Sequence, residues 1–271
     1  MTTVQRLTHG WEGAVERRLG DDVDVNLFLL GFVRAHSLDR AHWYGVVEGD
    51  EVRGVVLLVP DRLVVPWCPD PDDAAAIGRV LRDRFDPAML VGPRAASDAL
   101  WDAWTAGEVE PDRFYDQRLY VLAERPPGPP APGFRKARLS EWREIAHASG
   151  LMEHEDLGRN PHREYPALHE RVVRERVRTG RTWVIERDGR LVFQINIGTA
   201  LAEGAQIGGT WVPHARRGQG LATEGVRALC QHLLDHHPRV TLHVNEANTP
   251  AVRVYENVGF RRTEPFRLVT V

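Results

Sequence analysis

A run of nine residues, 125–133, constrains this chain most, because five of the nine are proline. Proline fixes φ and lacks an N–H group, so the run cannot enter a helix or the interior of a sheet and favours polyproline II. At roughly 3.1 Å per residue, it would be a semi-rigid spacer of about 25 Å. A chain of 271 residues is long enough for two domains. We therefore predict a first domain at 1–125, a Pro/Gly linker at 126–133 and a second domain at 134–271.

The hydrophobic pattern of the second half alternates between helix and strand periods. An Asp188-Gly189 pair between two apolar runs indicates a hairpin. We predict, in chain order, helices at 140–148 and 163–179, strands at 182–186, 191–197 and 205–212, a helix at 221–235, a strand at 240–244, a helix at 249–258 and final strands within 260–271.

The first half has a similar order of elements, as in a diverged internal repeat. The predicted fold class is α/β, mixed α+β, with a central, mostly antiparallel mixed sheet flanked by helices in each half. For the first half we predict a helix at 23–35, strands at 44–47, 52–59 and 63–67, a helix at 72–84, a strand at 88–91, a helix at 95–104 and a strand at 117–123.

Charge and cysteine content argue against several classes of protein. The formal net charge is −3, which gives no global electrostatic case for nucleic acid or an anionic membrane. Two cysteines, Cys68 and Cys230, make a disulfide framework or a thiolate metal site improbable. No signal peptide is visible, and no apolar stretch approaches the roughly 20 residues that span a bilayer. We expect a cytoplasmic protein without a metal, nucleic-acid or membrane partner.

Residues 211–222 read as a strand, a glycine loop and the start of a helix. Glycine allows a sharp turn and leaves no side chain between backbone N–H groups and a ligand. The first-turn N–H groups of a helix are unpaired and mildly positive, which suits a pyrophosphate. The segment has neither Gly-Lys-Ser/Thr nor a full G-x-G-x-x-G. For the loop alone, an ordinary strand–helix turn remains an alternative.

A second motif lies at residues 248–260. With the loop, it resembles the GNAT superfamily of acyl-CoA-dependent N-acyltransferases over roughly residues 134–271. The segment from Arg217 to Ala222 matches the family's R-x-x-G-x-G/A loop. One departure is that the family often has proline where this chain has His214, with its own proline at 213. The helix pattern N-x-x-A-x-x-x-Y-x-x-x-G-F is matched by Asn248, Ala251, Tyr255, Gly259 and Phe260.

The resemblance implies acetyl-CoA as cosubstrate, no metal, and Tyr255 as the general acid for the thioester sulfur. It implies that the backbone of Val212 and its neighbours and the side chain of Asn248 contact the pantetheine. Asn248 could instead simply cap a helix, and Tyr255 could be a core residue. The implied donor-binding residues are Trp211, Val212, Arg217, Gly218, Gln219, Gly220, Leu221, Ala222, Thr223 and Asn248.

The sequence gives less information about the residues that bind the acceptor amine. Holding an alkylammonium of pKa near 10.4 neutral at pH 7 costs roughly 4–5 kcal/mol, so a base or a water relay is useful. We expect residues 150–156 to form a loop between the first two helices of the second half, where the resemblance puts the acceptor site. Its Glu153, Glu155 and Asp156 are candidate substrate-binding residues, although a solvated polar loop is the plainer interpretation. His162 and His214 lack the spacing of metal ligands.

The corresponding part of the first half, residues 65–74, has no glycine and no arginine. Asp70 reads as an N-cap with Pro71 at the first helical position, and these acids would repel a diphosphate. The chain therefore resembles two-domain, tandem GNAT proteins whose first half has lost the cofactor loop. That half would shape the acceptor site or pack against another subunit, so monomer and homodimer both stay open.

Three functions follow. The first is acetyl-CoA-dependent N-acetyl transfer, by direct attack, to a primary amine of a small molecule or peptide. The second is a tandem transferase using another acyl donor to make a thiol cofactor or a modified peptide. The third is a non-catalytic acyl-CoA sensor. Tyr255 favours catalysis, since a sensor needs no proton for sulfur, while the lack of a clear base keeps the sensor open.

Overall fold

The computed structural model describes residues 2–271 and divides into two compact units. Unit 1 is the chain up to Val121 with His243–Thr249 and Arg262–Val271, and unit 2 is Leu122–Leu242 with Pro250–Arg261.

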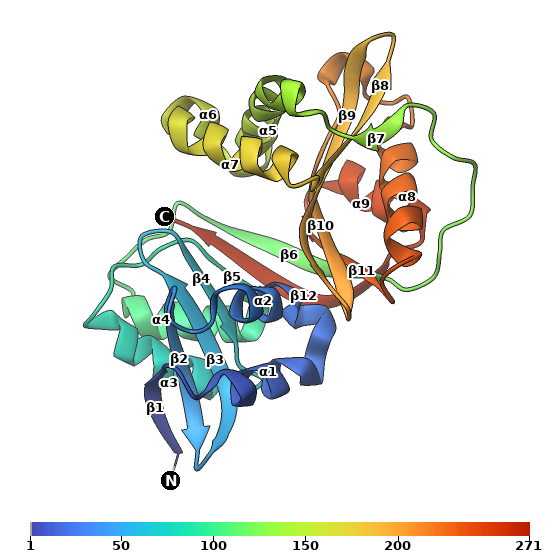
Figure 1. Cartoon of the computed structure of the whole chain (residues 1–271). Helices are drawn as coiled ribbons and strands as arrows, with labels where there is room; N and C mark the ends of the chain where they lie inside the picture. The colour runs from blue at the N-terminus through green and yellow to red at the C-terminus, as the bar shows by residue number, and fades with distance from the viewer. Residues whose placement is uncertain (1) are drawn as a thin grey trace. The chain divides into compact units, whose positions relative to one another are not determined.

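The end of the chain groups with unit 1, which differs from a division at the proline-rich run. Strand β12 (Arg261–Thr270), red in Figure 1, pairs antiparallel with β5 (Leu90–Pro93). The register runs from Phe266 opposite Pro93 to Val269 opposite Leu90. Strand pairing therefore makes the last residues of the chain part of a sheet formed by the first half.

The proline-rich run lies against a helix of unit 2. Its nine residues are all described, and none lies in a helix or strand. Gln231 of α8 (Leu221–Leu234) donates from Nε2 to the carbonyl oxygens of Pro126, at 3.0 Å, and Gly128, at 3.2 Å. Pro126 and Ala131 are buried. The run therefore lies outside helices and strands, as its proline content predicts, and α8 holds two of its backbone carbonyls.

Unit 1 contains a mixed sheet in the order β1-β2-β3-β4-β5-β12-β6. Strands β4 and β5 are parallel, whereas β1–β2, β2–β3, β3–β4 and β5–β12 are antiparallel pairs. Its elements are β1 (Thr2–Leu7), α1 (Glu12–Leu19), a 3-10 turn (Gly20–Asp22), α2 (Val23–His36), β2 (His42–Glu48), β3 (Glu51–Val59), β4 (Leu63–Trp67), α3 (Pro71–Arg82), β5, α4 (Arg94–Thr105), β6 (Arg113–Leu122) and β12.

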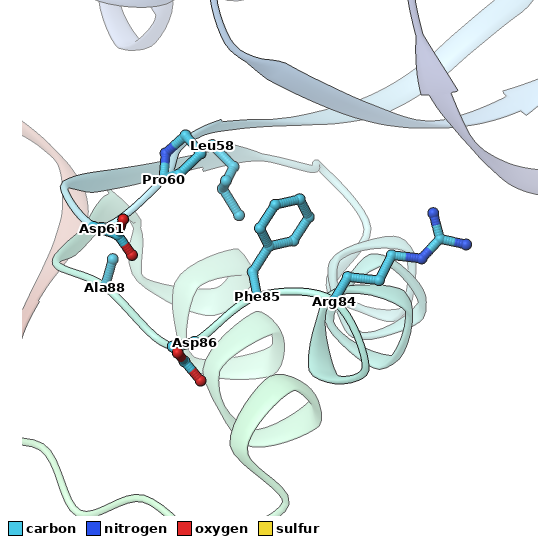
Figure 2. Close-up of a pocket in the computed structure, with 7 residues that line it drawn as sticks. All are labelled: Leu58, Pro60, Asp61, Arg84, Phe85, Asp86 and Ala88. Carbon is cyan, nitrogen blue, oxygen red and sulfur yellow. The ribbon is translucent and has the colours of Figure 1, made fainter.

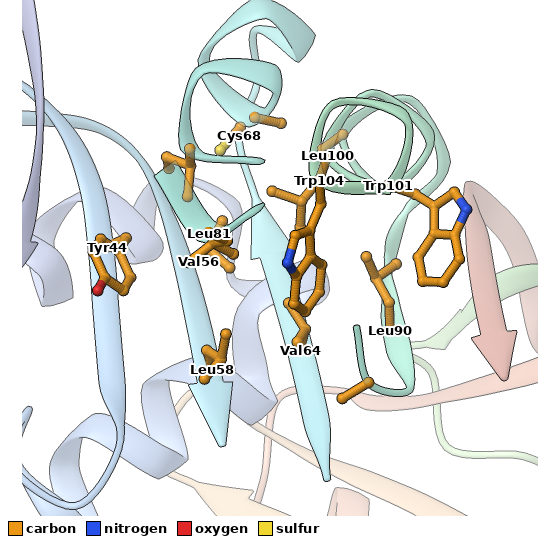
Figure 3. Packing of buried hydrophobic residues seen from close by; sticks show 14 of the residues in the cluster. Tyr44, Val56, Leu58, Val64, Cys68, Leu81, Leu90, Leu100, Trp101 and Trp104 are labelled. Carbon is orange, nitrogen blue, oxygen red and sulfur yellow. The ribbon is translucent and has the colours of Figure 1, made fainter. Parts of the chain in front are cut away.

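A core cluster of unit 1 lies between the sheet and helices α3 and α4, where Trp104 and Leu100 of α4 meet Val64 and Leu90 of the strands (Figure 3). Gly78 lets the two helices approach closely, because a Cβ there would lie 2.6 Å from the carbonyl oxygen of Leu100. This contact gives unit 1 a well-packed core of its own.

Unit 2 holds strands in the order β11-β10-β9-β8-β7, with β10 parallel to β11 and the others antiparallel; residues 243–245 at the end of β11 group with unit 1. Its elements are β7 (Phe134–Lys136), a 3-10 turn (Leu139–Glu141), α5 (Trp142–Leu157), α6 (Pro161–Glu164), α7 (Pro166–Arg178), β8 (Thr182–Arg187), β9 (Arg190–Leu201), β10 (Gly204–Trp211), a second 3-10 turn (His214–Arg216), α8, β11 (Val240–Asn245) and α9 (Thr249–Val258).

The predicted loop at 150–156 is helical. Helix α5 continues through it and ends at Gly158, which has a φ of +75°. Gly150 lies inside the helix, at a position with no room for a side chain. A Cβ there would lie 2.5 Å from the Cβ of His162 and 2.6 Å from Oδ1 of Asn160. The glycine serves close packing instead of ending the helix, and the carboxylates of Glu153, Glu155 and Asp156 therefore project from a helix.

Four elements were not predicted: β1, α1, β7 and α6. The final strands within 260–271 are one strand, β12. Among the helices of residues 2–271, none has the length and apolarity needed to cross a bilayer.

Candidate functional site

Strand β10 is irregular along its border with β9. Gly208 pairs with Asn196, and Trp211 pairs with Gln194. Between these pairs, β10 holds two residues and β9 holds one, so β10 carries a bulge at Gly209 and Thr210. Gly209 has a φ of +66°, the left-handed conformation of a glycine bulge. Such bulges redirect side chains, here near the end of the strand that leads into the glycine loop.

The segment between β10 and α8 turns on two glycines. Gly218 has a φ of +76° and Gly220 a φ of +78°, values that L side chains rarely adopt. A Cβ at either position would meet nothing within 4 Å. Both glycines therefore leave open space in front of the loop backbone.

Helix α8 begins at Leu221 with Gly220 as its N-cap, and no described side chain hydrogen-bonds that cap. Its first-turn N–H groups have no intrahelical partners. The only acid of the first turn, Glu224, accepts a 2.7 Å hydrogen bond from Nη2 of Arg187, which offsets its charge. The terminus thus presents unpaired donors and the positive end of the helix dipole to an anion.

Arg217 is held beside this loop by three contacts. Its Nε donates to the carbonyl oxygen of Val212 at 3.1 Å, and its guanidinium lies 4.6 Å from the centroid of the Trp211 ring. Its Nη2 donates to Oε2 of Glu155 at 2.8 Å, and the other oxygen of Glu155 contacts Nε2 of His214. The carboxylate from α5 therefore bridges two basic groups of the loop, while the Arg217 side chain stays 42% exposed.

Tyr255 of α9 is 7% exposed, and its hydroxyl donates to Oγ1 of Thr210 at 3.3 Å. Burial raises the pKa of the phenol above its usual range; the Thr210 hydrogen bond lowers it, and the charge of Asp156 raises it further. The phenol is therefore protonated at neutral pH and able to give a proton.

Glu153 is a half-buried carboxyl on α5. Burial raises its pKa, against the opposing charge of Arg176 on α7, while Asp156 and Glu164 raise it further. A carboxylate of raised pKa is a stronger base than a solvated one. Glu153 thus differs from Glu155, whose carboxylate contacts Arg217 and His214 of the loop.

The remaining predicted site residues lie as follows. Trp211, Val212 and Leu221 are buried, Gln219 is exposed, and Ala222 and Thr223 are half-buried in the first turn of α8. Asn248 directly precedes α9, donates its backbone N–H to Asn245 at 2.9 Å and belongs to unit 1.

Sequence reasoning missed Thr210 and Arg187 as parts of this site. The Gly208-Gly209 pair inside a strand was the available signal, because glycine within a strand often marks a bulge. No sequence signal links Arg187 to Glu224, since the two are 37 positions apart and meet only in the fold.

Unit 1 has a separate hollow of about 240 Å³, lined by Leu58, Pro60, Asp61, Arg84, Phe85, Asp86 and Ala88 (Figure 2). Its polar residues lie on exposed turns, and it shares no residue with the glycine loop. Across residues 2–271, no group of three or more His, Cys, Asp or Glu side chains is arranged to hold a metal ion.

Residues 139–260 match the acetyltransferase (GNAT) family. Three solved structures resemble the fold over nearly the whole chain. A GNAT-family acetyltransferase from Colwellia psychrerythraea is 12% identical, with 98% of each chain covered and a TM-score of 0.63. A GCN5-related N-acetyltransferase from Sphaerobacter thermophilus is 17% identical, covering 99% of this chain and 94% of its own, with a TM-score of 0.64.

The third is a tandem GNAT protein from the clavulanic acid biosynthesis pathway. It is 18% identical, covers 100% of this chain and 98% of its own, and gives a TM-score of 0.57. Among curated proteins, none matches this chain in sequence. At these identities, the solved structures establish the fold, including its tandem layout.

Proposed function

Since residues 139–260 form a domain of the acetyltransferase (GNAT) family, whose chemistry is acyl transfer, we propose that this chain is an acetyl-CoA-dependent N-acetyltransferase. Its acceptor would be a primary amine of a small molecule or peptide. The observation that carries the proposal is the N-terminus of α8, which has no described side-chain cap and is preceded by two glycines of positive φ with open space before them.

In this proposal, the diphosphate of acetyl-CoA lies on the loop and the first turn of α8. The N–H groups there would donate to its oxygens, and Arg217 would add charge. Asn248 would contact the pantetheine, as the family resemblance implies. The donor-binding set is Trp211, Val212, Arg217, Gly218, Gln219, Gly220, Leu221, Ala222, Thr223 and Asn248.

The chemistry is direct attack. The amine nitrogen forms a bond to the thioester carbonyl carbon, and backbone N–H groups near Val212 stabilise the oxyanion. The C–S bond then breaks with its electron pair on sulfur, while the O–H proton of Tyr255 passes to sulfur. The hydroxyl and burial of Tyr255 support this role, because a phenol is protonated at neutral pH and the buried side chain has a fixed position.

Glu153 is the proposed base for the amine proton, directly or through water, because burial raises its pKa. With Glu155 and Asp156, it would also attract an ammonium to the acceptor side. Cys68 and Cys230 are free and buried, in keeping with the cytoplasmic location we propose. We propose no nucleic-acid or membrane partner, and a monomer or homodimer.

Thiol release from acetyl-CoA across a panel of small and peptide amines tests the proposal. We expect amine-dependent release of CoA, lost in Gly220→Glu. Binding of acetyl-CoA without release by any amine would replace the enzyme with an acyl-CoA sensor. Release of CoA from another acyl thioester but not from acetyl-CoA would show that the protein is a transferase with a different acyl donor.

A further inference from the structure

The hydroxyl of Tyr255 donates a hydrogen bond to Oγ1 of Thr210, at 3.3 Å. The ring packs edge-on against Phe260, with centroids 5.9 Å apart, which restricts the orientation of the ring. A buried hydroxyl that must give up a proton needs a partner that can both accept and donate. A threonine hydroxyl has one donor and two acceptor lone pairs, so it meets both needs.

The bulge in β10 determines which side of the sheet the Thr210 side chain faces. In a regular register continued from Gly208, Thr210 would take the place of Trp211 opposite Gln194, and its side chain would face the other side of the sheet. The left-handed φ of Gly209 makes room for the extra residue. The hydrogen bond to Tyr255 is therefore a product of the bulge.

The bulge is itself fixed from the neighbouring strands. A Cβ on Gly209 would lie 2.3 Å from Nδ2 of Asn196, so the Asn196 amide packs directly on the glycine. Oδ1 of Asn196 accepts a 2.8 Å hydrogen bond from the hydroxyl of Thr182. Thr182 is fully buried and Asn196 is 6% exposed. A buried polar pair thus holds the strand in the shape that points Thr210 at Tyr255.

We propose that Thr210 is a positioning residue for Tyr255: its hydroxyl accepts the phenol O–H in the resting site, and it donates to the phenol oxygen once that O–H turns toward sulfur. This inference rests on the proposed function. When the O–H bond of Tyr255 breaks and an S–H bond forms, the Tyr255 oxygen becomes negative. The Thr210 hydroxyl then turns its own proton toward that oxygen, and a hydrogen bond to an ionised oxygen is stronger than a neutral one. No proton leaves Thr210.

Replacing Thr210 by valine or by serine tests this, each in the wild-type and in the Tyr255→Phe background. Valine keeps the shape but removes the hydroxyl, whereas serine keeps the hydroxyl. With acetyl-CoA and the fastest amine of the panel, Thr210→Val should lower kcat about tenfold, the effect of one lost hydrogen bond. Thr210→Ser should stay within about threefold, and the Kd for acetyl-CoA should not change in either.

In the Tyr255→Phe background, Thr210→Val should have no further effect, because the hydroxyl has no proton donor left to position. An equal loss in both backgrounds would overturn the inference and make Thr210 a support of the strand alone. If Tyr255→Phe itself leaves kcat unchanged, the proposed general acid fails, and the positioning role fails with it.

A second measurement requires no acceptor. In protein labelled with 13Cζ tyrosine, the Tyr255 resonance, assigned by its loss in Tyr255→Phe, reports the hydrogen bonding of its oxygen at neutral pH. It should move in Thr210→Val and keep its position in Thr210→Ser. A resonance unchanged in Thr210→Val would contradict the hydrogen bond on which the inference rests.

Discussion

The N-termini of α3 in unit 1 and α8 in unit 2 differ in what meets their first turn. Helix α3 of unit 1 begins behind Asp70, whose carboxylate accepts from the N–H of Asp72 at 3.0 Å, with Pro71 in the first turn. Helix α8 of unit 2 begins behind Gly220, with no described side-chain cap. The first terminus is satisfied by the chain, and the second leaves its donors for an outside anion.

The charges around the two termini reinforce the difference. Arg53 lies 3.3 Å from Asp70 and 3.2 Å from Asp73, so the arginine near α3 is already used by the helix's own acids. At α8, Arg187 is paired with Glu224, and Arg217 contacts Glu155 from a different helix. The N-terminus of α3 is capped by Asp70, the residue directly before the helix. At the N-terminus of α8, a bound anion could replace Glu155 as the partner of Arg217.

The largest effect should come from Gly220→Glu, which places a carboxylate at the open terminus. The helix field that favours an anion would then act on the protein's own side chain, so acetyl-CoA affinity should fall at least about 100-fold. Calorimetry measures the Kd. Gly189→Glu is the matched control, since Gly189 also has a positive φ, +69°, with nothing within 4 Å of a Cβ. Its binding should equal wild type.

Tyr255→Phe should lower kcat about 100-fold, the low end for a general acid, with little change in the Kd for acetyl-CoA. A thiol of pKa about 8.5 is a fair leaving group unaided, so a larger loss is not expected. The ring keeps its packing, and stability should fall by no more than about 1.5 kcal/mol. Initial rates of CoA release and thermal unfolding check both. A large rise in Kd with unchanged kcat would recast Tyr255 as a binding residue.

Glu155→Gln should tighten acetyl-CoA binding about fivefold. The diphosphate must replace the Glu155 carboxylate on Arg217, and removing a partly exposed ion pair lowers that cost by about 1 kcal/mol. Glu175→Gln is the control, because Glu175 pairs with Arg178 at 2.7 Å on the exposed face of α7. Weaker binding in Glu155→Gln would mean that Glu155 orients Arg217 for the donor instead of competing with it.

The smallest effect should come from Asp70→Gly in unit 1, which gives α3 a glycine N-cap like that of α8. Replacing an aspartate cap by glycine costs only a few tenths of a kcal/mol, so thermal unfolding should change little. No second acetyl-CoA should bind, because Pro71 and the acids Asp72 and Asp73 remain in the first turn. A second molecule of acetyl-CoA bound to this variant would show that the Asp70 cap alone prevents unit 1 from binding acetyl-CoA.

Local signals predicted the fold well where they matched local structure. The cap of Asp70 and Pro71 and the start of α8 at Leu221 lie where the sequence put them, because capping is decided within a few residues. The loop predicted at 150–156 was wrong, since Gly150 packs inside α5 against Asn160 and His162, which become its neighbours only after folding. The pairing of β12 with β5 was equally invisible, as the two lie far apart in sequence.

For the site, the sequence supplied the glycines and Tyr255 but not their surroundings. The bulge that aims Thr210, the Arg187–Glu224 pair and the bridge from Glu155 to Arg217 all depend on tertiary contacts. Apart from the Gly208-Gly209 pair at the bulge, the sequence carries no direct signal of these contacts.

The stoichiometry of acetyl-CoA binding to the full chain, measured by calorimetry, tests the central claim most directly. The account predicts one molecule per chain, lost in Gly220→Glu and kept in Gly189→Glu. Two molecules per chain, or one molecule that survives Gly220→Glu in a folded protein, would contradict a single donor site at the N-terminus of α8.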